Sequence, residues 1–300
     1  MAERLVRTRR PVDLALTLAP LRISGGLDPC VRIGRDGVWR ATRTPDGPAT
    51  MHLWTEADRA VRVEAWGPGA AAALEAAPAL IGADDEPASL ARAHPVVADL
   101  ARRHPGLRIG RSGAVLEALV PTTLGQKVQG VEARSAWVAM VNAAAQPAPG
   151  PARLLLPPEP GWLQSTPSWA FHRWGVEHRR TETIKVAAGY ARRLEESVGL
   201  PLAEARRRLA ALPGVGPWTV NEVARLALGD ADAVSVGDYW IKHQVSWALA
   251  GEPRGTDERM LELLEPWRGQ RGLVCRLLEV GGPRPPRFGP RLPLRAIAAT

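Results

Sequence analysis

A turn rich in glycine and proline is the part of the sequence best suited to binding chemistry. Residues 209–228, LAALPGVGPWTVNEVARLAL, predict a helix end, the hairpin LPGVG at 212–216, and a second helix opened by Pro217. Gly214 and Gly216 permit backbone conformations that a side chain would obstruct, so the hairpin exposes unpaired amides. Such amides, with a helix dipole behind them, bind a phosphate without reading sequence. An ordinary tight connection between antiparallel helices is the alternative, and the flanking Leu-Pro and Pro-Trp-Thr favour the phosphate clamp.

A carboxylate follows the hairpin about one helix later. Residues 230–249, DADAVSVGDYWIKHQVSWAL, predict a loop and then a helix with Asp238 at or near its first turn. Because Asp is a common N-cap, one interpretation of Asp238 is purely structural. The other is that its charge faces a bound nucleotide and stabilises an oxocarbenium-like sugar as the base departs, or orients the attacking water. Sugar glycosidases generally use two carboxylates, but a damaged or cationic base leaves readily, so one can suffice. The spacing of hairpin and acid favours catalysis.

Composition and charge narrow the class of partner. The chain has 300 residues and a formal net charge of +8, which fits a polyanion such as nucleic acid. The support is mild, because a GC-rich genome would also enrich Ala, Arg, Gly and Pro. Lysine is nearly absent, which leaves few candidates for a catalytic amine; the lysines are Lys127, Lys185 and Lys242.

Several other classes of protein are disfavoured. Cys30 and Cys275 alone cannot supply an iron-sulfur cluster or a structural zinc site, and the six histidines show no ligand spacing, so we expect no cofactor and no metal held by side chains. The His-x-Glu and Pro-Cys-x-x-Cys signature of zinc base deaminases is missing. No stretch approaches the roughly 18 apolar residues of a membrane span, and the N-terminus lacks the features of a signal peptide. We expect a cytoplasmic protein in a reducing environment, with no membrane partner.

Hydrophobic patterning predicts an α+β fold in two parts. Residues 1–90 form an N-terminal domain with an antiparallel β-sheet and helices, and residues 91–282 form an all-α body. Residues 283–300 are a Pro/Arg-rich basic tail, either a flexible arm or an extended end. The predicted elements are strands at 12–18, 49–54 and 60–66, a hairpin over 31–42 around Asp36-Gly37, a helix at 70–80, a helix from Pro121 to about 138 capped by Thr122 and Thr123, a linker at 146–152 and a helix at 177–198.

The two motifs also carry a family resemblance. LPGVGPWT followed by VSVGDYWIK resembles the helix-hairpin-helix, Gly/Pro-rich, Asp superfamily of DNA glycosylases, especially bacterial 3-methyladenine DNA glycosylase II and its actinobacterial relatives. LVPTTLGQKVQGVEA at 119–133 is similar to the family's helix beginning Leu-x-Gln-x-Val, and LLEPWRGQRG at 263–272 to its Pro-Trp-Arg segment. The N-terminal strands are similar to an extra β-domain of that subfamily. The resemblance covers nearly the whole chain and implies a helix-hairpin-helix glycosylase body.

The resemblance implies roles for individual residues. Asp238 would be the catalytic residue, in its ionised form. Trp218 stands where bifunctional relatives carry a nucleophilic lysine, which implies a water-based, monofunctional mechanism. Trp218 would then stack on the flipped base, with core packing of the hairpin as the alternative, and Lys242 would contact solvent or phosphate. The segment that would hold a DNA phosphate, with a monovalent cation as an option there, comprises Leu212, Gly214, Val215 and Gly216.

The chain departs from the family at the base pocket and at the wedge. Glu222 and Arg276 stand where a tyrosine and a tryptophan help line the pocket, which weakens the expectation of a broad preference for cationic alkylated purines. Lys127 stands at the wedge position; lysine cannot plug a base stack as leucine does, although it can reach phosphate or a base edge. Gln126 is a candidate for contacting the opened base pair, with packing or capping as the alternative.

The sequence thus predicts a monomeric, monofunctional DNA N-glycosylase of base-excision repair acting on duplex DNA. It would flip out a damaged, alkylated purine and hydrolyse its N-glycosidic bond, leaving an abasic site. A different lesion, such as hypoxanthine or 8-oxoguanine, is one alternative. A non-catalytic lesion-binding protein, a bifunctional glycosylase-lyase and a structural DNA-binding module are the others.

Overall fold

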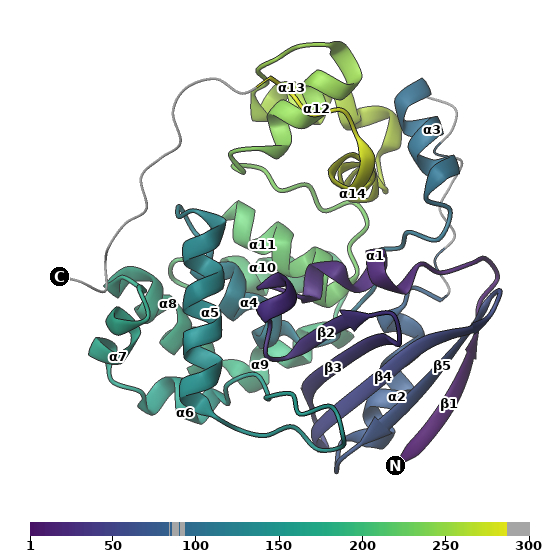
Figure 1. Ribbon diagram of the computed structural model, residues 1–300. Coiled ribbons are helices and arrows are strands. Elements are labelled where there is room, and N and C mark those ends of the chain that lie inside the picture. Colours follow the sequence, from purple (N-terminus) through teal and green to yellow (C-terminus); the bar gives the residue numbers. More distant parts are fainter. Residues whose placement is uncertain (84, 86–89, 91–93, 287–300) are drawn as a thin grey trace.

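The N-terminal part of the chain is an antiparallel sheet. The computed structural model describes residues 1–83, 85, 90 and 94–286 (Figure 1). Within these residues the strands lie in the order β1-β5-β4-β3-β2, and helices follow, so the predicted α+β class is confirmed. The strands are β1 (Ala2–Arg7), β2 (Val31–Gly34), β3 (Gly37–Thr44), β4 (Gly47–Ala57) and β5 (Ala60–Trp66).

The predicted hairpin and the two strands after it are confirmed, as is the helix at 70–80. In the β2–β3 turn Gly37 has φ of 113°, and a Cβ there would lie 2.2 Å from the carbonyl oxygen of Leu53. Only glycine fits such a turn without strain. Helix α2 (Ala70–Leu80) then packs its buried alanines and leucines against β1, β4 and β5.

The strand predicted at 12–18 is wrong. This segment forms the helix α1 (Leu14–Leu18), and Asp13 caps it by accepting a hydrogen bond from the amide of Leu16 at 2.9 Å. Leu14 and Leu18 are both buried, and residues four apart share one face of a helix. The spacing of the apolar residues therefore fits a helix as well as a strand. The cap that Asp13 provides favours the helix. The strand that sequence reasoning missed is β1, which pairs with β5.

In the rest of the described chain the regular elements are helices joined by loops, and none of these helices is long and apolar enough to span a bilayer. Helix α11 continues into a π-helical turn at Ala224–Leu228. The α-helices are α3 (Pro95–Arg103), α4 (Val115–Leu124), α5 (Gly130–Ala144), α6 (Pro160–Ser165), α7 (Ser168–Arg173), α8 (His178–Gly189), α9 (Ala191–Glu195), α10 (Leu202–Ala210), α11 (Pro217–Val223), α12 (Ile241–Ala250), α13 (Asp257–Leu264) and α14 (Arg271–Gly281).

The helix predicted to start at Pro121 is also wrong. Pro121 and the two threonines after it lie inside α4, which ends at Gly125, and a separate helix, α5, follows. A capping box between Gln129 and Glu132 starts α5, because each side chain there bonds the other residue's amide. The helix predicted at 177–198 is likewise divided, at Tyr190, into α8 and α9.

Two large hydrophobic cores hold most of the elements together, and a small third cluster packs Trp39 and Ala41 of β3 against Ala152, Leu154 and Leu156. One joins the inner face of the sheet to α2, α4, α5, α8 and α11, and the other lies among α3, α12, α13 and α14, which form the upper lobe in Figure 1. Residues 229–240 run from the first core to the second. The loop carrying Asp238 therefore lies where the two meet. Of the tail predicted at 283–300, residues 287–300 lie outside the described residues.

Candidate functional site

The hairpin between α10 and α11 turns its backbone outward. The side chains of Leu212 and Val215 are buried, and the amide of Val215 donates to the carbonyl oxygen of Leu212 at 3.1 Å. Gly214 and Gly216 are exposed, and their amides donate to no partner in the described part of the chain. The hairpin therefore presents two N–H groups to solvent beside the start of α11, an arrangement able to hold an anion.

The two glycines of this hairpin are needed for different reasons. Gly214 has φ of +82°, and a Cβ there would lie 2.0 Å from Oγ1 of Thr183 on α8. Gly216 has φ of −96°, and a Cβ there would meet nothing within 4 Å. Gly214 is therefore required by the fold itself, whereas the space above Gly216 is open to a group outside the protein.

The loop after α4 is fastened to the hairpin. Nε2 of Gln126 donates to the carbonyl oxygen of Gly214 at 3.0 Å and to Oγ1 of Thr219 at 2.9 Å. The next residue, Lys127, has φ of 54° and an exposed side chain. Gln126 thus serves the packing of the hairpin in this structure, and Lys127 projects into solvent next to it.

Asp238, two residues before the N-cap Trp240, holds the start of α12 with one carboxylate oxygen. Its Oδ1 accepts the amides of Trp240 at 2.7 Å and Ile241 at 2.9 Å, and its own amide donates to the carbonyl oxygen of Ser235 at 3.0 Å. Oδ2 accepts no hydrogen bond from the residues that the structure describes. The structural and the catalytic interpretations are therefore compatible, since capping leaves one oxygen of the carboxylate free.

Trp218 connects the hairpin to the loop that carries Asp238. The indole is partly buried; a Cβ at Gly237 would lie 4.0 Å from Cβ of Trp218, and a Cβ at Gly125 would lie 3.4 Å from its Cη2. Gly237 immediately precedes Asp238, and Gly125 ends α4. Trp218 therefore lies between the turn of Asp238 and the loop of Gln126 and Lys127, where it can border a bound base.

Glu222 belongs to a polar network beside Asp238. It lies one turn after Trp218 on the same face of α11. Its Oε1 accepts the hydroxyl of Ser235, and its Oε2 accepts Nη2 of Arg225 at 2.7 Å. Burial works against the charge of Arg225, but attraction from Glu222 and from a second glutamate outweighs it and raises the pKa of the guanidinium. Sequence reasoning missed Ser235 and Arg225; closeness to Asp238 in the chain was the one signal for Ser235.

Lys242 is held in an ion pair. Its Nζ lies 3.5 Å from Oδ2 of Asp257, whose Oδ1 accepts the amide of Gly237 at 3.1 Å. Asp257 therefore braces both the turn before Asp238 and the lysine after it. No pattern in the sequence pointed to Asp257, because it comes from a different helix, α13.

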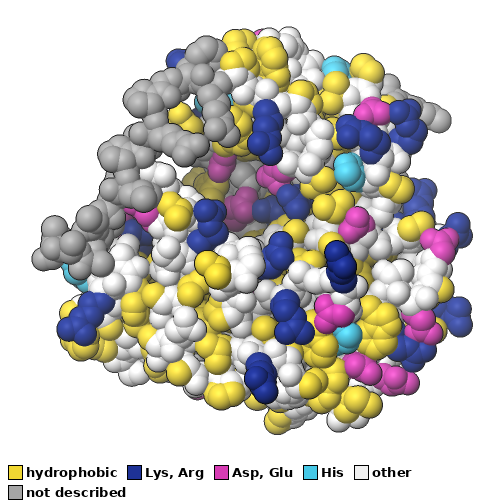
Figure 2. Space-filling model, in the orientation of Figure 1, with side chains coloured by type: hydrophobic (Ala, Val, Ile, Leu, Met, Phe, Trp, Pro, Cys, Tyr) yellow, Lys and Arg dark blue, Asp and Glu magenta, His cyan; other side chains and the backbone are white. Residues whose placement is uncertain are grey.

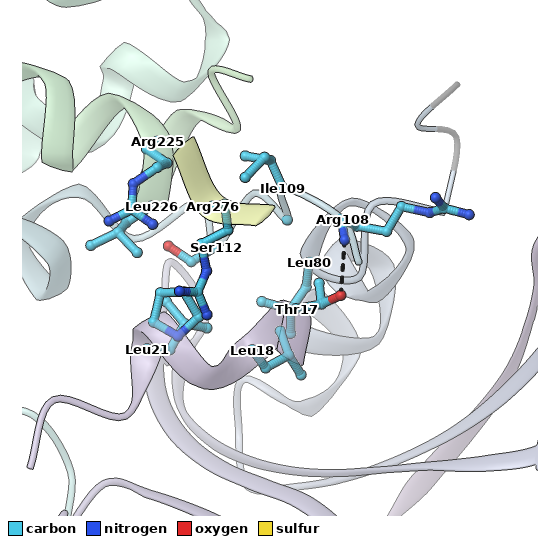
Figure 3. A pocket seen from close by; sticks show the side chains of 12 residues that line it. Thr17, Leu18, Leu21, Leu80, Arg108, Ile109, Ser112, Arg225, Leu226 and Arg276 are labelled. Atoms are coloured by element: carbon cyan, nitrogen blue, oxygen red, sulfur yellow. Dashed lines mark hydrogen bonds between the residues drawn. The ribbon is translucent and has the colours of Figure 1, made fainter. Parts of the chain in front are cut away.

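Arg276 reaches the same region from α14. Its side chain pairs with Glu279 at 2.8 Å, and its Nε is buried without a hydrogen-bond partner among the described residues. It lines a small, open cleft together with Arg225 and Ser112. In Figure 3 the side chain of Arg276 runs from α14 toward Leu21, and its Nη2 donates to the carbonyl oxygen of Leu16 on α1 at 3.4 Å.

Sequence comparison gives a short match. No protein-family model matches the sequence. A stretch of 64 residues is 39% identical to the "Probable bifunctional transcriptional activator/DNA repair enzyme AlkA" of Mycobacterium tuberculosis, in each of two strains. The match spans 21% of this chain and 13% of the relative's length.

Structural comparison covers almost the whole chain. A 3-methyladenine DNA glycosylase from Archaeoglobus fulgidus is similar with a TM-score of 0.78 and 18% identity, over 92% of this chain and 97% of that one. An 8-oxoguanine glycosylase/lyase from Clostridium acetobutylicum has a TM-score of 0.68 and 13% identity, over 93% and 96%. The protein titled MBOgg1, solved with a low affinity DNA ligand, has a TM-score of 0.70 and 17% identity, over 93% and 94%. The chain therefore has the fold of these three proteins, and the fold that the resemblance implied is confirmed.

Proposed function

We propose that this protein is a monofunctional DNA N-glycosylase that extrudes a damaged purine from duplex DNA and leaves an abasic site. One observation carries the proposal: Trp218 lies between a hairpin with free amides and the turn of Asp238, whose Oδ2 is free among the described residues. Phosphate binding, base stacking and charge stabilisation thus have adjacent groups to perform them. The fold shared with DNA glycosylases supports the same activity.

The hairpin grips the DNA backbone in this proposal. The amides of Gly214 and Gly216 donate to a phosphate oxygen, and the net charge of +8 adds attraction that does not depend on sequence. Lys127 reaches a phosphate or a base edge near the gap left by the extruded nucleotide. A single chain carries all these groups, so a monomer is sufficient.

Asp238 acts on the sugar of the extruded nucleotide. The bond between C1′ and the base nitrogen breaks, its electron pair leaves with the base, and the ionised carboxylate stabilises the positive charge that develops on the sugar. A water molecule then attacks C1′ and gives up a proton to Asp238 or to solvent. Trp218 has no amine, so it forms no Schiff base with the sugar, and the reaction stops at the abasic site.

A panel of lesions tests the proposal and names the substrate. Duplexes carrying an alkylated purine, hypoxanthine, 8-oxoguanine or uracil are incubated with the protein, and free base and strand breaks are measured with and without alkali. We expect a free purine, strand breaks only after alkali, and no adduct on borohydride treatment. A trapped adduct would indicate a glycosylase-lyase, and tight binding to abasic DNA without any release would indicate a lesion-binding protein.

A further inference from the structure

We propose that Glu222 reads the extruded base by accepting two N–H hydrogen bonds. The preferred lesions are then damaged purines that keep a guanine-like edge, with N1–H beside a 2-amino group. This inference rests on the proposed function and concerns which base the site selects.

Two hydrogen bonds and one shared helix face place Glu222 beside Trp218 and Asp238. It shares a face of α11 with Trp218, and its Oε1 accepts the hydroxyl of Ser235. The carbonyl oxygen of Ser235 in turn accepts the amide of Asp238 at 3.0 Å. In Figure 2 a hollow opens between the lobe that carries α12–α14 and the body beneath it, and acidic and basic side chains gather there. Glu222 is therefore linked to Asp238 through Ser235 and to Trp218 through α11, and the proposal places the extruded base against these three side chains.

The carboxylate of Glu222 has capacity left for a ligand. An ionised carboxylate has about four acceptor sites, two on each oxygen. Ser235 uses one site on Oε1 and Arg225 uses one on Oε2, at 2.7 Å. One site therefore remains on each oxygen, which matches two parallel N–H donors. The side chain is 18% exposed, so a ligand can reach it, and two anchors hold its plane fixed.

The chemistry of the base edges sets the expected order of preference. A guanine-type edge presents two adjacent donors to the carboxylate. Hypoxanthine presents only N1–H, and an adenine-type edge presents one amino donor beside the lone pair of N1, which a carboxylate oxygen repels. A well-placed pair of hydrogen bonds to a base edge discriminates roughly tenfold to hundredfold. The inference therefore predicts preference for guanine-type over adenine-type lesions of that size.

Competition within one substrate tests this preference. Duplex DNA treated with a methylating agent carries 7-methylguanine and 7-methyladenine, which share the methyl position and differ at the edge that Glu222 would read. Mass spectrometry of the released bases, divided by their initial amounts, gives the ratio of specificity constants. We expect the intact protein to favour 7-methylguanine at least tenfold. Glu222→Gln exchanges one acceptor for a donor, so it fits the adenine edge and shifts the ratio roughly tenfold to hundredfold toward 7-methyladenine.

Controls separate base reading from general damage to the site. Glu262→Gln removes an exposed carboxylate that pairs with Arg259 on α13 and touches none of Ser235, Arg225 and Asp238, so the ratio stays unchanged. A purely structural role of Glu222 would slow release of both bases equally, and that result would overturn the inference. If Glu222→Gln fails to fold, Ser235→Ala serves instead; it keeps the carboxylate but frees Oε1, and the preference falls.

Failure of the proposed function remains distinguishable from failure of this inference. Release of both bases with the same ratio in the intact protein and in Glu222→Gln refutes only the reading role of Glu222. Release of neither base, together with no release from the lesion panel, refutes the proposed activity. In that case the protein is bound to an abasic duplex and titrated in a calorimeter with free 7-methylguanine or free 7-methyladenine. The two affinities measure the preference for the base edge directly, and equal affinities refute the inference as well.

Discussion

Replacing Gly214 by alanine should destabilise the hairpin through two separate effects. The residue has φ of +82°, where an alanine costs about 1–2 kcal/mol. Its new methyl group would also lie 2.0 Å from Oγ1 of Thr183, and such overpacking costs about 1–3 kcal/mol. We therefore expect Gly214→Ala to lower the free energy of unfolding by about 2–5 kcal/mol.

Gly216→Ala is the matched control two residues away. Its φ of −96° suits any residue and its Cβ meets nothing within 4 Å, so the free energy of unfolding should change by less than about 0.5 kcal/mol. The methyl group does stand where a phosphate would approach the exposed amide. We expect affinity for duplex DNA to fall in Gly216→Ala although its stability is unchanged.

A double-mutant cycle measures the clash. Urea denaturation of Gly214→Ala, Thr183→Ala and the double variant separates the two effects, because removing the Thr183 side chain relieves the overpacking but not the backbone strain. We expect a favourable coupling of about 1–3 kcal/mol. Equal stability of Gly214→Ala and Gly216→Ala, or a coupling near zero, would refute the assignment of Gly214 to the fold.

Three further predictions concern other contacts. Partial burial works against the charge of Asp232, but hydrogen bonds from the side chain and amide of Arg271 and from the amide of Gly269 outweigh it and lower the pKa of Asp232 below 3.8. The ionised carboxylate therefore stabilises the folded protein fully above about pH 4. This stabilisation is lost as the pH falls through the lowered pKa. Asp232→Asn should lower the free energy of unfolding, measured by urea denaturation at pH 7, by about 2 kcal/mol and make it less dependent on acid pH. An unchanged urea midpoint would contradict this prediction. Gln126→Ala removes the bond to Gly214 and should cost about 1 kcal/mol and weaken DNA binding in a fluorescence titration, whereas unaltered binding would separate the loop from the clamp. Burial raises the pKa of the Cys275 thiol, so a thiol reagent at pH 8 should label it only after unfolding, and rapid labelling of the folded protein would show that the second core opens.

Local patterns predicted much of the fold. The turn at Asp36-Gly37, the alternation of the two strands after it and the alanine-rich helix at 70–80 each carry a signal within a few residues, and each is confirmed. The segment at 12–18 fits both periods, and β1 has no flanking turn signal that separates it from the chain end. The break after Gly125 depends on a capping box that starts the next helix. A pattern of apolar residues on one face does not reveal such a break.

The site was predictable where it is contiguous in the sequence. The hairpin and Asp238 sit in short motifs that the sequence locates, and the roles assigned to them stay predictions. Thr183, which makes Gly214 obligatory, comes from α8, and Asp257, which braces the turn before Asp238, comes from α13. Long-range packing of this kind leaves no mark on local spacing, so only the structure reveals these supports.

The most direct measurement of the proposed chemistry is the single-turnover rate of base release by the intact protein and by Asp238→Asn, with DNA saturated in both cases. The amide keeps an oxygen that can accept the amides of Trp240 and Ile241, so folding and DNA affinity should persist while the stabilising charge is lost. We expect release to slow by roughly a hundredfold or more at unchanged affinity. Equal rates in the two proteins would show that Asp238 only caps α12 and that the catalytic group lies elsewhere.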